Sequence, residues 1–227
     1  MTATITDGAP DRNPYTFPPM RPPVFEEVGE LRLKKADESI DLQSLTTSCE
    51  LDVLFVIDAS YSMAWSFRRV KIAISEAVKR LPIGPDGVRV AILLYADRNM
   101  DTSILDFNEY STRSSLLAAI NGLRLLGGPT SADSGLRTAA AALEQAARDG
   151  VKRVAFLFTD GYSKDSPNAG AALRRQAEVY AVGVWTRRKG GPRVETLLAI
   201  AGSRARVLLD ERLAEFQGVV DNALATC

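Results

Sequence analysis

The chain has 227 residues, of which 46% are hydrophobic and 25% are charged, a balance typical of an ordinary globular protein. Its formal net charge is zero, so no overall electrostatic field favours binding to nucleic acid or to an anionic membrane. The sequence contains no histidine, which excludes imidazole bases, His-ligated zinc and Ser-His-Asp triads.

The first 48 residues are predicted to lie outside the main folded domain. The start, MTATITDGAP, lacks the basic and apolar regions of a signal peptide, and no apolar run in the chain approaches the roughly 20 residues that cross a bilayer. Prolines then concentrate in PYTFPPMRPP, which is typical of an extended, polyproline-like linker. We interpret residues 1–48 as a Pro-rich linker or partly ordered strap and residues 49–227 as one domain.

The domain is predicted to begin with a buried strand at residues 51–58, LDVLFVID, whose continuous apolar run is expected of a central strand covered on both faces. Residues 66–81 carry apolar residues at helical spacing, and residues 83–87, IGPDG, form a turn. Strands follow at 88–96 and 102–107. Only about six residues join these two strands, too few for a helical crossover, so they should pair antiparallel.

The middle of the domain is predicted to be helical. Residues 111–126 and 134–150 carry helical patterns, and the loop between them, residues 127–133, reads GGPTSAD. A buried strand follows at residues 152–161, and its sequence AFLFTDG ends, like the first strand, close to an aspartate, Asp160.

The last part of the domain continues the same alternation. Helices are predicted at residues 169–177, 194–202 and 213–227, and strands at residues 178–185 and 205–210. Strands that alternate with helices indicate a parallel sheet. The predicted fold class is therefore α/β, a doubly wound, mostly parallel central sheet with one antiparallel edge strand and helices on both faces.

Polar side chains gather where this fold binds ligands, outside the carboxyl ends of the strands. They come from three separate loops, and they are Asp58, Ser60, Ser62, Thr130 and Asp160. Two carboxylates and three hydroxyls offer only hard oxygen ligands, and a compact octahedral site of such ligands suits Mg²⁺ or Mn²⁺ better than Ca²⁺. The competing interpretation is that Asp58 and Ser60 cap the next helix, but capping does not account for Thr130 and Asp160.

The only two cysteines bracket the patterned region, since Cys49 precedes the first strand and Cys227 is the last residue. They are either two unrelated thiols or a disulfide that ties both ends of the domain. Closing so long a loop contributes up to about 5 kcal/mol in the loop-entropy estimate. A disulfide would also indicate an oxidising compartment.

The segments DASYS, the threonine after GG, and FTDG resemble the three parts of the metal-ion-dependent adhesion site of von Willebrand factor type A domains, and the resemblance covers residues 49–227. It implies that the five polar residues listed above form the metal site, that the hydroxyls bind directly, and that a partner's Glu or Asp fills an open position. The flanking cysteines resemble those of extracellular members such as matrilins and non-fibrillar collagens, which implies an extracellular location.

The sequence departs from the common pattern of these domains around the predicted site. Ala59 and Tyr61 replace small residues, and Tyr61 is expected either to touch the partner or to pack on the neighbouring loop. The loop TRRKGGPR is too short for the extra helix of collagen-binding integrin domains, which favours the matrix-protein type. Its basic side chains form either a solvated loop or an anion-binding rim; they are Arg187, Arg188, Lys189 and Arg193.

The function that these features favour is a non-enzymatic module that uses Mg²⁺, or Mn²⁺, to bind an acidic residue of a matrix or cell-surface protein. A magnesium-dependent hydrolase with Asp58 as nucleophile is the enzymatic alternative. That chemistry usually needs a second carboxylate two residues later, where this chain has Ser60, and the sequence has no G-x-x-x-x-G-K-[ST] phosphate loop. An intracellular type A domain that scaffolds a larger assembly is the remaining alternative, and the oxidation state of the cysteines distinguishes it.

Overall fold

The computed structural model describes residues 49–97, 103–146, 148–163, 170–187, 189–209 and 213–227. All of the described residues belong to one compact unit within Ser44–Cys227. The predicted linker or strap at residues 1–48 lies outside the described residues, so its interpretation stays a prediction.

A six-stranded sheet forms the centre of the described unit, with the strand order β3-β2-β1-β4-β5-β6. The strands are β1 (Leu51–Asp58), β2 (Val88–Tyr95), β3 (Ser103–Leu105), β4 (Lys152–Thr159), β5 (Glu178–Gly183) and β6 (Val207–Leu208). Neighbours pair in parallel, except that β2 and β3 pair antiparallel at one edge. The predicted mostly parallel sheet with one antiparallel edge strand is therefore confirmed.

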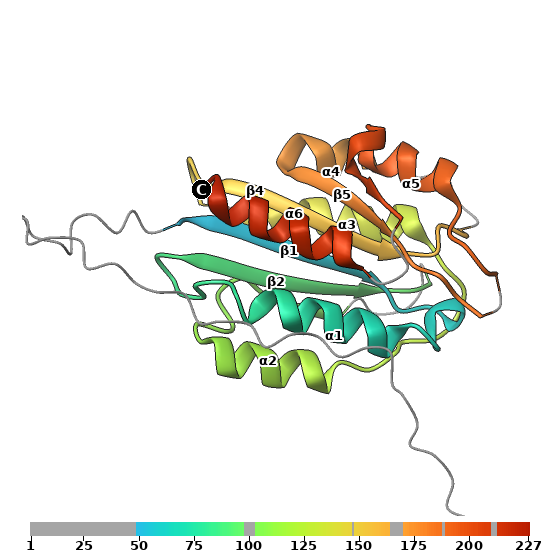
Figure 1. The fold of residues 1–227 in the computed structure, drawn as a ribbon, viewed down its shortest axis with the longest axis horizontal. Helices are drawn as coiled ribbons and strands as arrows, with labels where there is room; N and C mark the ends of the chain where they lie inside the picture. The colour runs from blue at the N-terminus through green and yellow to red at the C-terminus, as the bar shows by residue number, and fades with distance from the viewer. Residues whose placement is uncertain (1–48, 98–102, 147, 164–169, 188, 210–212) are drawn as a thin grey trace, which may run out of the picture. The chain divides into compact units, whose positions relative to one another are not determined.

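The position of β1 follows from its composition. All of its residues are buried, as its apolar run predicts, and it lies between β2 and β4. The register pairs Asp58 with Tyr95 on β2 and Ile57 with Phe158 on β4. The three strands consequently end at the same edge of the sheet (Figure 1), and the polar residues that follow them are brought together.

Helices cover both faces of the sheet, as predicted (Figure 1). They are α1 (Phe67–Val78), α2 (Arg113–Gly122), α3 (Ala132–Ala146), α4 (Gly170–Gln176), α5 (Val194–Ala201) and α6 (Ala214–Ala225). Helices α1, α2 and α6 pack on one face, where the ring of Phe216 lies 5.0–6.1 Å from those of three strand phenylalanines. Helices α3, α4 and α5 pack on the other face, around Leu54 and Leu157.

Helix α2 ends earlier than the apolar pattern of residues 111–126 predicts. It stops at Gly122, and Leu123 adopts an extended conformation with φ −56° and ψ 134°. Leu125 and Leu126 still pack, partly buried, against the core. The apolar side chains of this stretch therefore reach the core from an extended segment, which a helical spacing count does not distinguish from another turn of helix.

Other boundaries also differ from the predictions. Helix α3 begins at Ala132, two residues before its predicted start, which shortens the loop that carries Thr130. Of the described residues in the predicted strand at 205–210, only the two of β6 form a strand, because Arg204–Arg206 form a 3₁₀ turn and the strand has a neighbour, β5, on one side alone. Among the described residues, no helix is long and apolar enough to cross a bilayer.

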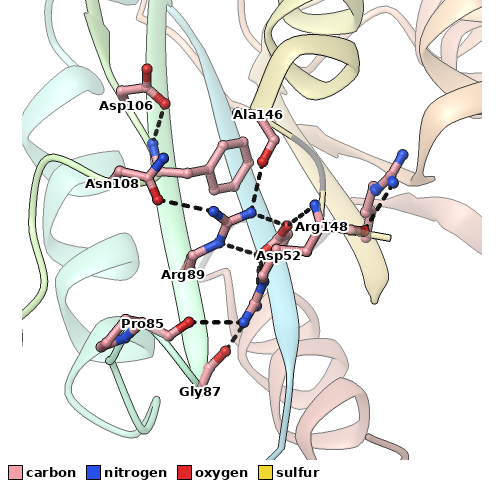
Figure 2. Close-up of polar contacts among 10 residues, drawn as sticks. Asp52, Pro85, Gly87, Arg89, Asp106, Asn108, Ala146 and Arg148 are labelled. Atoms are coloured by element: carbon pink, nitrogen blue, oxygen red, sulfur yellow. Dashed lines mark hydrogen bonds and ion pairs between the residues drawn. The ribbon is translucent and has the colours of Figure 1, made fainter. Parts of the chain in front are cut away.

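The amino end of β1 is held by covalent and ionic bonds. Cys49 and Cys227 form a disulfide with their Cα atoms 5.1 Å apart, as one of the two interpretations of the cysteines predicts. Next to it, the buried carboxylate of Asp52 accepts hydrogen bonds from the guanidinium groups of Arg89 (2.6 and 2.9 Å) and Arg148 (2.7 and 3.1 Å), as Figure 2 shows. This edge of the sheet is therefore closed by bonds within the chain.

Candidate metal centre

The first predicted segment forms a tight turn at the carboxyl end of β1. Asp58 and Ser60 are almost completely buried. The Asp58 Oδ1 atom accepts the Ser60 N–H at 3.0 Å, and the hydroxyl of Ser60 lies 3.2 Å from that of Ser62. Ser60 begins the short 3₁₀ helix Tyr61–Met63 without a side-chain cap bond, and α1 begins only at Phe67. The capping interpretation is therefore wrong for Ser60, whose hydroxyl is directed to Ser62.

A residue that the sequence analysis did not single out, Thr159, joins the first segment to the third. Its hydroxyl donates to Asp58 Oδ2 at 2.8 Å and accepts the N–H of Gly161 at 3.0 Å. The register explains this contact, because Ile57 pairs with Phe158 and the next residues along the two strands are Asp58 and Thr159. Thr159 thus fixes the orientation of a predicted ligand.

Asp160 is the second buried carboxylate of the site. Its Oδ1 atom accepts the N–H of Tyr162 at 3.0 Å, and its backbone carbonyl accepts the N–H of Arg193 at 2.9 Å. Its Oδ2 atom is buried and has no hydrogen-bond partner within the described part of the chain. A buried carboxylate oxygen without a partner is costly, so this side chain is suited to a ligand from outside the described residues.

The loop that carries Thr130, the second predicted segment, is bound to the other two. The N–H of Gly127 donates to the carbonyl of Ala59 at 2.9 Å, directly after β1. The hydroxyl of Ser163, three residues after Asp160, donates to the carbonyl of Thr130 at 3.2 Å. The structure therefore brings the three segments together at one edge of the sheet, and Ser163 is a second positioning residue that the sequence analysis did not identify.

The electrostatics of the site favour a cation. Burial raises the pKa of Asp58 from its ordinary 3.8 to about 6; hydrogen bonds from Ser60 oppose this rise, and the negative charge of Asp160 adds to it. In the described residues no cluster of three or more His, Cys, Asp or Glu side chains could hold a metal, so hydroxyl ligands would have to complete any site here. Two buried carboxylates beside several hydroxyls form an oxygen-only set, which fits a hard divalent cation.

The predicted rim lies around this site, with aromatic rings that the sequence analysis did not connect to it. Tyr61 is 69% exposed, and its ring packs on the neighbouring loop at Gly127. The approach is close, because a Cβ atom at Gly127 would lie only 2.9 Å from the Tyr61 ring. The guanidinium of Arg187 lies 4.4 Å from the centroid of the Trp65 ring.

On the same loop, the ammonium of Lys189 lies 5.0 Å from the ring centroid of Tyr162, and Arg193 is exposed. Arg188 lies outside the described residues. The rim is therefore built from cation–aromatic pairs as well as charge.

A family model for the von Willebrand factor type A domain matches residues 52–222. The chain belongs to this family. Its type A domain is similar over 189 residues to human matrilin-3, with 32% identity, covering 78% of this chain and 36% of that protein. It is also 32% identical over 149 residues to the mouse collagen alpha-4(VI) chain, covering 63% of this chain and 6% of that one.

Solved structures agree with this family. Proximal thread matrix protein 1 from the mussel byssus, in a structure with a zinc-occupied MIDAS motif, is 26% identical to this chain, with a TM-score of 0.65. The match covers 79% of this chain and 46% of that one. The metal in that motif, the metal-ion-dependent adhesion site, is a property of the mussel protein.

Proposed function

We propose that this type A domain binds a divalent cation at the carboxyl edge of its sheet and uses it to hold an acidic side chain of a protein partner. The observation that carries the proposal is the pair of buried carboxylates, Asp58 and Asp160, whose charges repel each other. Neither has an ion-pair partner among the described residues, and one oxygen of Asp160 has no hydrogen bond there. A cation relieves both costs at once.

The residues that would hold the cation are Asp58, Ser60, Ser62, Thr130 and Asp160. We infer Mg²⁺ as the resident ion, with Mn²⁺ as the alternative, because the set contains only hard oxygen ligands. A cation bound mainly by neutral hydroxyls retains much of its positive charge, which attracts a carboxylate from outside. The chain's own part is to bury the two aspartates, to orient Asp58 through the hydroxyl of Thr159, and to hold the loop of Thr130 through the hydroxyl of Ser163.

We further propose that the domain works outside the cell, with a matrix or cell-surface protein as its partner. The Cys49–Cys227 disulfide supports an oxidising compartment and disfavours the intracellular scaffold. The similarity to matrilin-3 and to collagen chains supports the same setting. The type A domain spans 36% or less of each of these two relatives, so the activity of the whole protein is part of the proposal.

A binding module is favoured over a magnesium-dependent hydrolase by the state of Asp58. A nucleophilic carboxylate needs a free oxygen that reaches the substrate. Both oxygens of Asp58 already accept hydrogen bonds, from the Ser60 N–H and the Thr159 hydroxyl, and the residue is fully buried. The Asp58 side chain is therefore suited to a place among the ligands of a small cation, and it is poorly suited to nucleophilic attack on a substrate.

Calorimetric titration of metal-stripped protein with Mg²⁺, and separately with Mn²⁺, tests the metal site. We expect saturable binding to wild type and a loss of at least about tenfold in Asp160→Asn. Asparagine keeps an oxygen for the Tyr162 N–H, so the turn should remain intact. The control is Asp221→Asn. Asp221 lies on helix α6, where its exposed carboxylate pairs with Arg80, so this substitution should leave the metal affinity unchanged.

The partner step is tested with a capped peptide that contains a single glutamate, immobilised on a sensor surface. Binding of wild-type protein should be tighter in Mg²⁺ or Mn²⁺ than in metal-free buffer, and Thr130→Ala, which removes a neutral hydroxyl without changing the net charge, should reduce this gain. Absence of metal binding in the wild-type calorimetry would refute the proposed site, and metal binding without any metal-dependent peptide binding would limit the cation to a structural role.

A further inference from the structure

A groove of about 380 Å³ lies beside the candidate metal centre, on the same edge of the sheet. Its walls come from two segments, the start of α1 with the two residues before it and the chain after β5. Its lining residues are Trp65, Ser66, Arg69, Trp185, Thr186 and Arg187. None of these six residues is acidic. Two guanidinium groups and two indole rings therefore share one small groove.

The groove is held in shape by hydrogen bonds between its two walls. The carbonyl of Trp185 accepts the Ser66 hydroxyl at 2.6 Å and an N–H of Arg69 at 2.9 Å. Thr186 and Gly190 exchange backbone hydrogen bonds of 2.9 Å in both directions, which closes the loop that carries Arg187. Because both walls are tied down, a ligand would find the groove largely preformed.

The positive charge in the groove has no counterion within the described part of the chain. Neither Arg69 nor Arg187 has an ion pair there, whereas the buried guanidinium of Arg89 and the partly buried guanidinium of Arg148 share the carboxylate of Asp52. A guanidinium offers five N–H donors. Arg69 uses one of them for the Trp185 carbonyl, and its Nε is buried without a hydrogen-bond partner.

The second guanidinium is presented at the surface by an aromatic ring. Arg187 lies 4.4 Å from the ring centroid of Trp65, which is 70% exposed. Stacking of this kind orients the guanidinium plane and leaves its N–H edge available for an oxyanion. A planar carboxylate, which accepts two parallel hydrogen bonds from one guanidinium, matches this arrangement.

We propose that this groove, which we call the tryptophan–arginine groove, binds a second carboxylate of the protein partner, an Asp or Glu close in sequence to the one held at the metal. The proposal rests on the proposed function for the identity of the partner, since the groove and the metal centre share one edge. A sulfated glycan is less well matched, because its charges are spread along a chain and call for a row of exposed cations.

The chain offers a direct spectroscopic readout. It contains only two tryptophans, Trp65 and Trp185, and both line the groove. Titration of metal-stripped full chain, in buffer without a chelator, with the capped single-glutamate peptide should therefore give a saturable change in intrinsic fluorescence that weakens with added salt. Because the bound cation has been removed and no polycarboxylate chelator is left to compete for the groove, this response is independent of the metal centre.

Arg187→Gln should weaken the peptide response about tenfold, the loss expected for a charge-assisted hydrogen bond to a carboxylate. Arg187→Lys, which keeps the charge and loses the fork of donors, should restore only part of it. The matched control is Arg68→Gln, an exposed arginine next to Arg69 on α1 that does not line the groove, and it should bind like wild type.

With Mg²⁺ present, a capped peptide with two glutamates should bind more tightly than the single-glutamate peptide, and Arg187→Gln should remove this advantage. The inference is overturned if metal-stripped wild type shows no saturable response, if Arg68→Gln weakens binding as much as Arg187→Gln, or if only a heparin oligosaccharide gives the response. Normal metal binding without the metal-free peptide response refutes the groove alone, and the reverse result refutes the metal centre alone.

Discussion

The two ends of β1 carry buried aspartates in opposite electrostatic surroundings. At the amino end, burial by itself raises the pKa of Asp52, but hydrogen bonds and charges from Arg89 and Arg148 outweigh it, so the pKa lies below the ordinary 3.8 (Figure 2). At the carboxyl end, burial of Asp58 is reinforced by the negative charge of Asp160, and the pKa rises to about 6.

We propose that this difference separates a structural carboxylate, Asp52, from a metal ligand, Asp58. Asp52 and Asp58 are the same residue type on the same buried strand, so burial alone does not decide their roles. The amino end is completed within the chain, by two arginines and by the Cys49–Cys227 disulfide. At the carboxyl end, hydroxyl groups take the place of arginines. The negative charge of the two aspartates there is therefore available to a cation from solution.

The largest expected effect is the loss of the amino-end cluster. Asp52→Asn leaves the guanidiniums of Arg89 and Arg148 with no carboxylate, and removing one partner of a buried ion pair costs about 3–5 kcal/mol. Denaturant unfolding at neutral pH should show this loss in the free energy of unfolding. Asp221→Asn, the same substitution in an exposed pair, should cost no more than about 1 kcal/mol, and equal losses in the two variants would break the comparison.

At the carboxyl end, removing the charge of the aspartate is expected to increase the free energy of unfolding when no metal is present. The pKa of Asp58 is raised in the folded state, so the metal-free fold binds its proton more tightly than the unfolded chain between pH 3.8 and about 6. Its contribution to stability is present below pH 3.8 and is lost as pH rises to about 6. The difference between these pKa values corresponds to about 3 kcal/mol at most. In EDTA at pH 7.5, Asp58→Asn should therefore be more stable than wild type.

The measurement is the free energy of unfolding from pH 4 to pH 8 in EDTA, for wild type and Asp58→Asn. Taking the difference between the two proteins removes the contribution of Asp52, whose lowered pKa acts in the other direction, with stability lost as pH falls below about 3.8. We expect the advantage of Asp58→Asn to grow from pH 4 to about 6 and then level off. A difference that does not change with pH would show that folding does not raise the pKa of Asp58 in the metal-free protein.

The contrast also indicates which parts of the molecule a single sequence predicts. The apolar runs of β1 and β4, and the aspartates that end them, were sufficient for the parallel sheet and for the convergence of Asp58 and Asp160 at its edge. Both inferences depend on local patterns together with the geometry of parallel strands. The extended Leu123 shows the limit of such patterns, because an apolar spacing is the same whether a helix continues or stops.

Several side-chain contacts between segments far apart in the sequence were not predicted. Asp52 is separated from Arg89 by 37 residues and from Arg148 by 96, and nothing local marks these arginines as its partners. The role of Thr159 depends on the register between β1 and β4, which is set by packing in the folded core. The stacking of Arg187 on Trp65 likewise joins two loops that are adjacent only in the fold.

The smallest expected effect, and the most specific test of the carboxyl end, comes from a substitution at Thr159. Valine has nearly the same shape as threonine, so Thr159→Val removes the hydroxyl and with it two hydrogen bonds, the one donated to Asp58 Oδ2 and the one accepted from the Gly161 N–H. The free energy of unfolding should fall by about 2 kcal/mol, since each buried hydrogen bond contributes about 1 kcal/mol. The pKa of Asp58 should rise further, because the hydrogen bond from Thr159 lowers it.

The metal affinity of Thr159→Val, measured by calorimetry with Mg²⁺, should weaken at pH 6 more than at pH 8, since the proton then competes more strongly for the Asp58 carboxylate. Equal weakening at both pH values would mean that Thr159 acts on the shape of the site alone and does not tune the charge of Asp58.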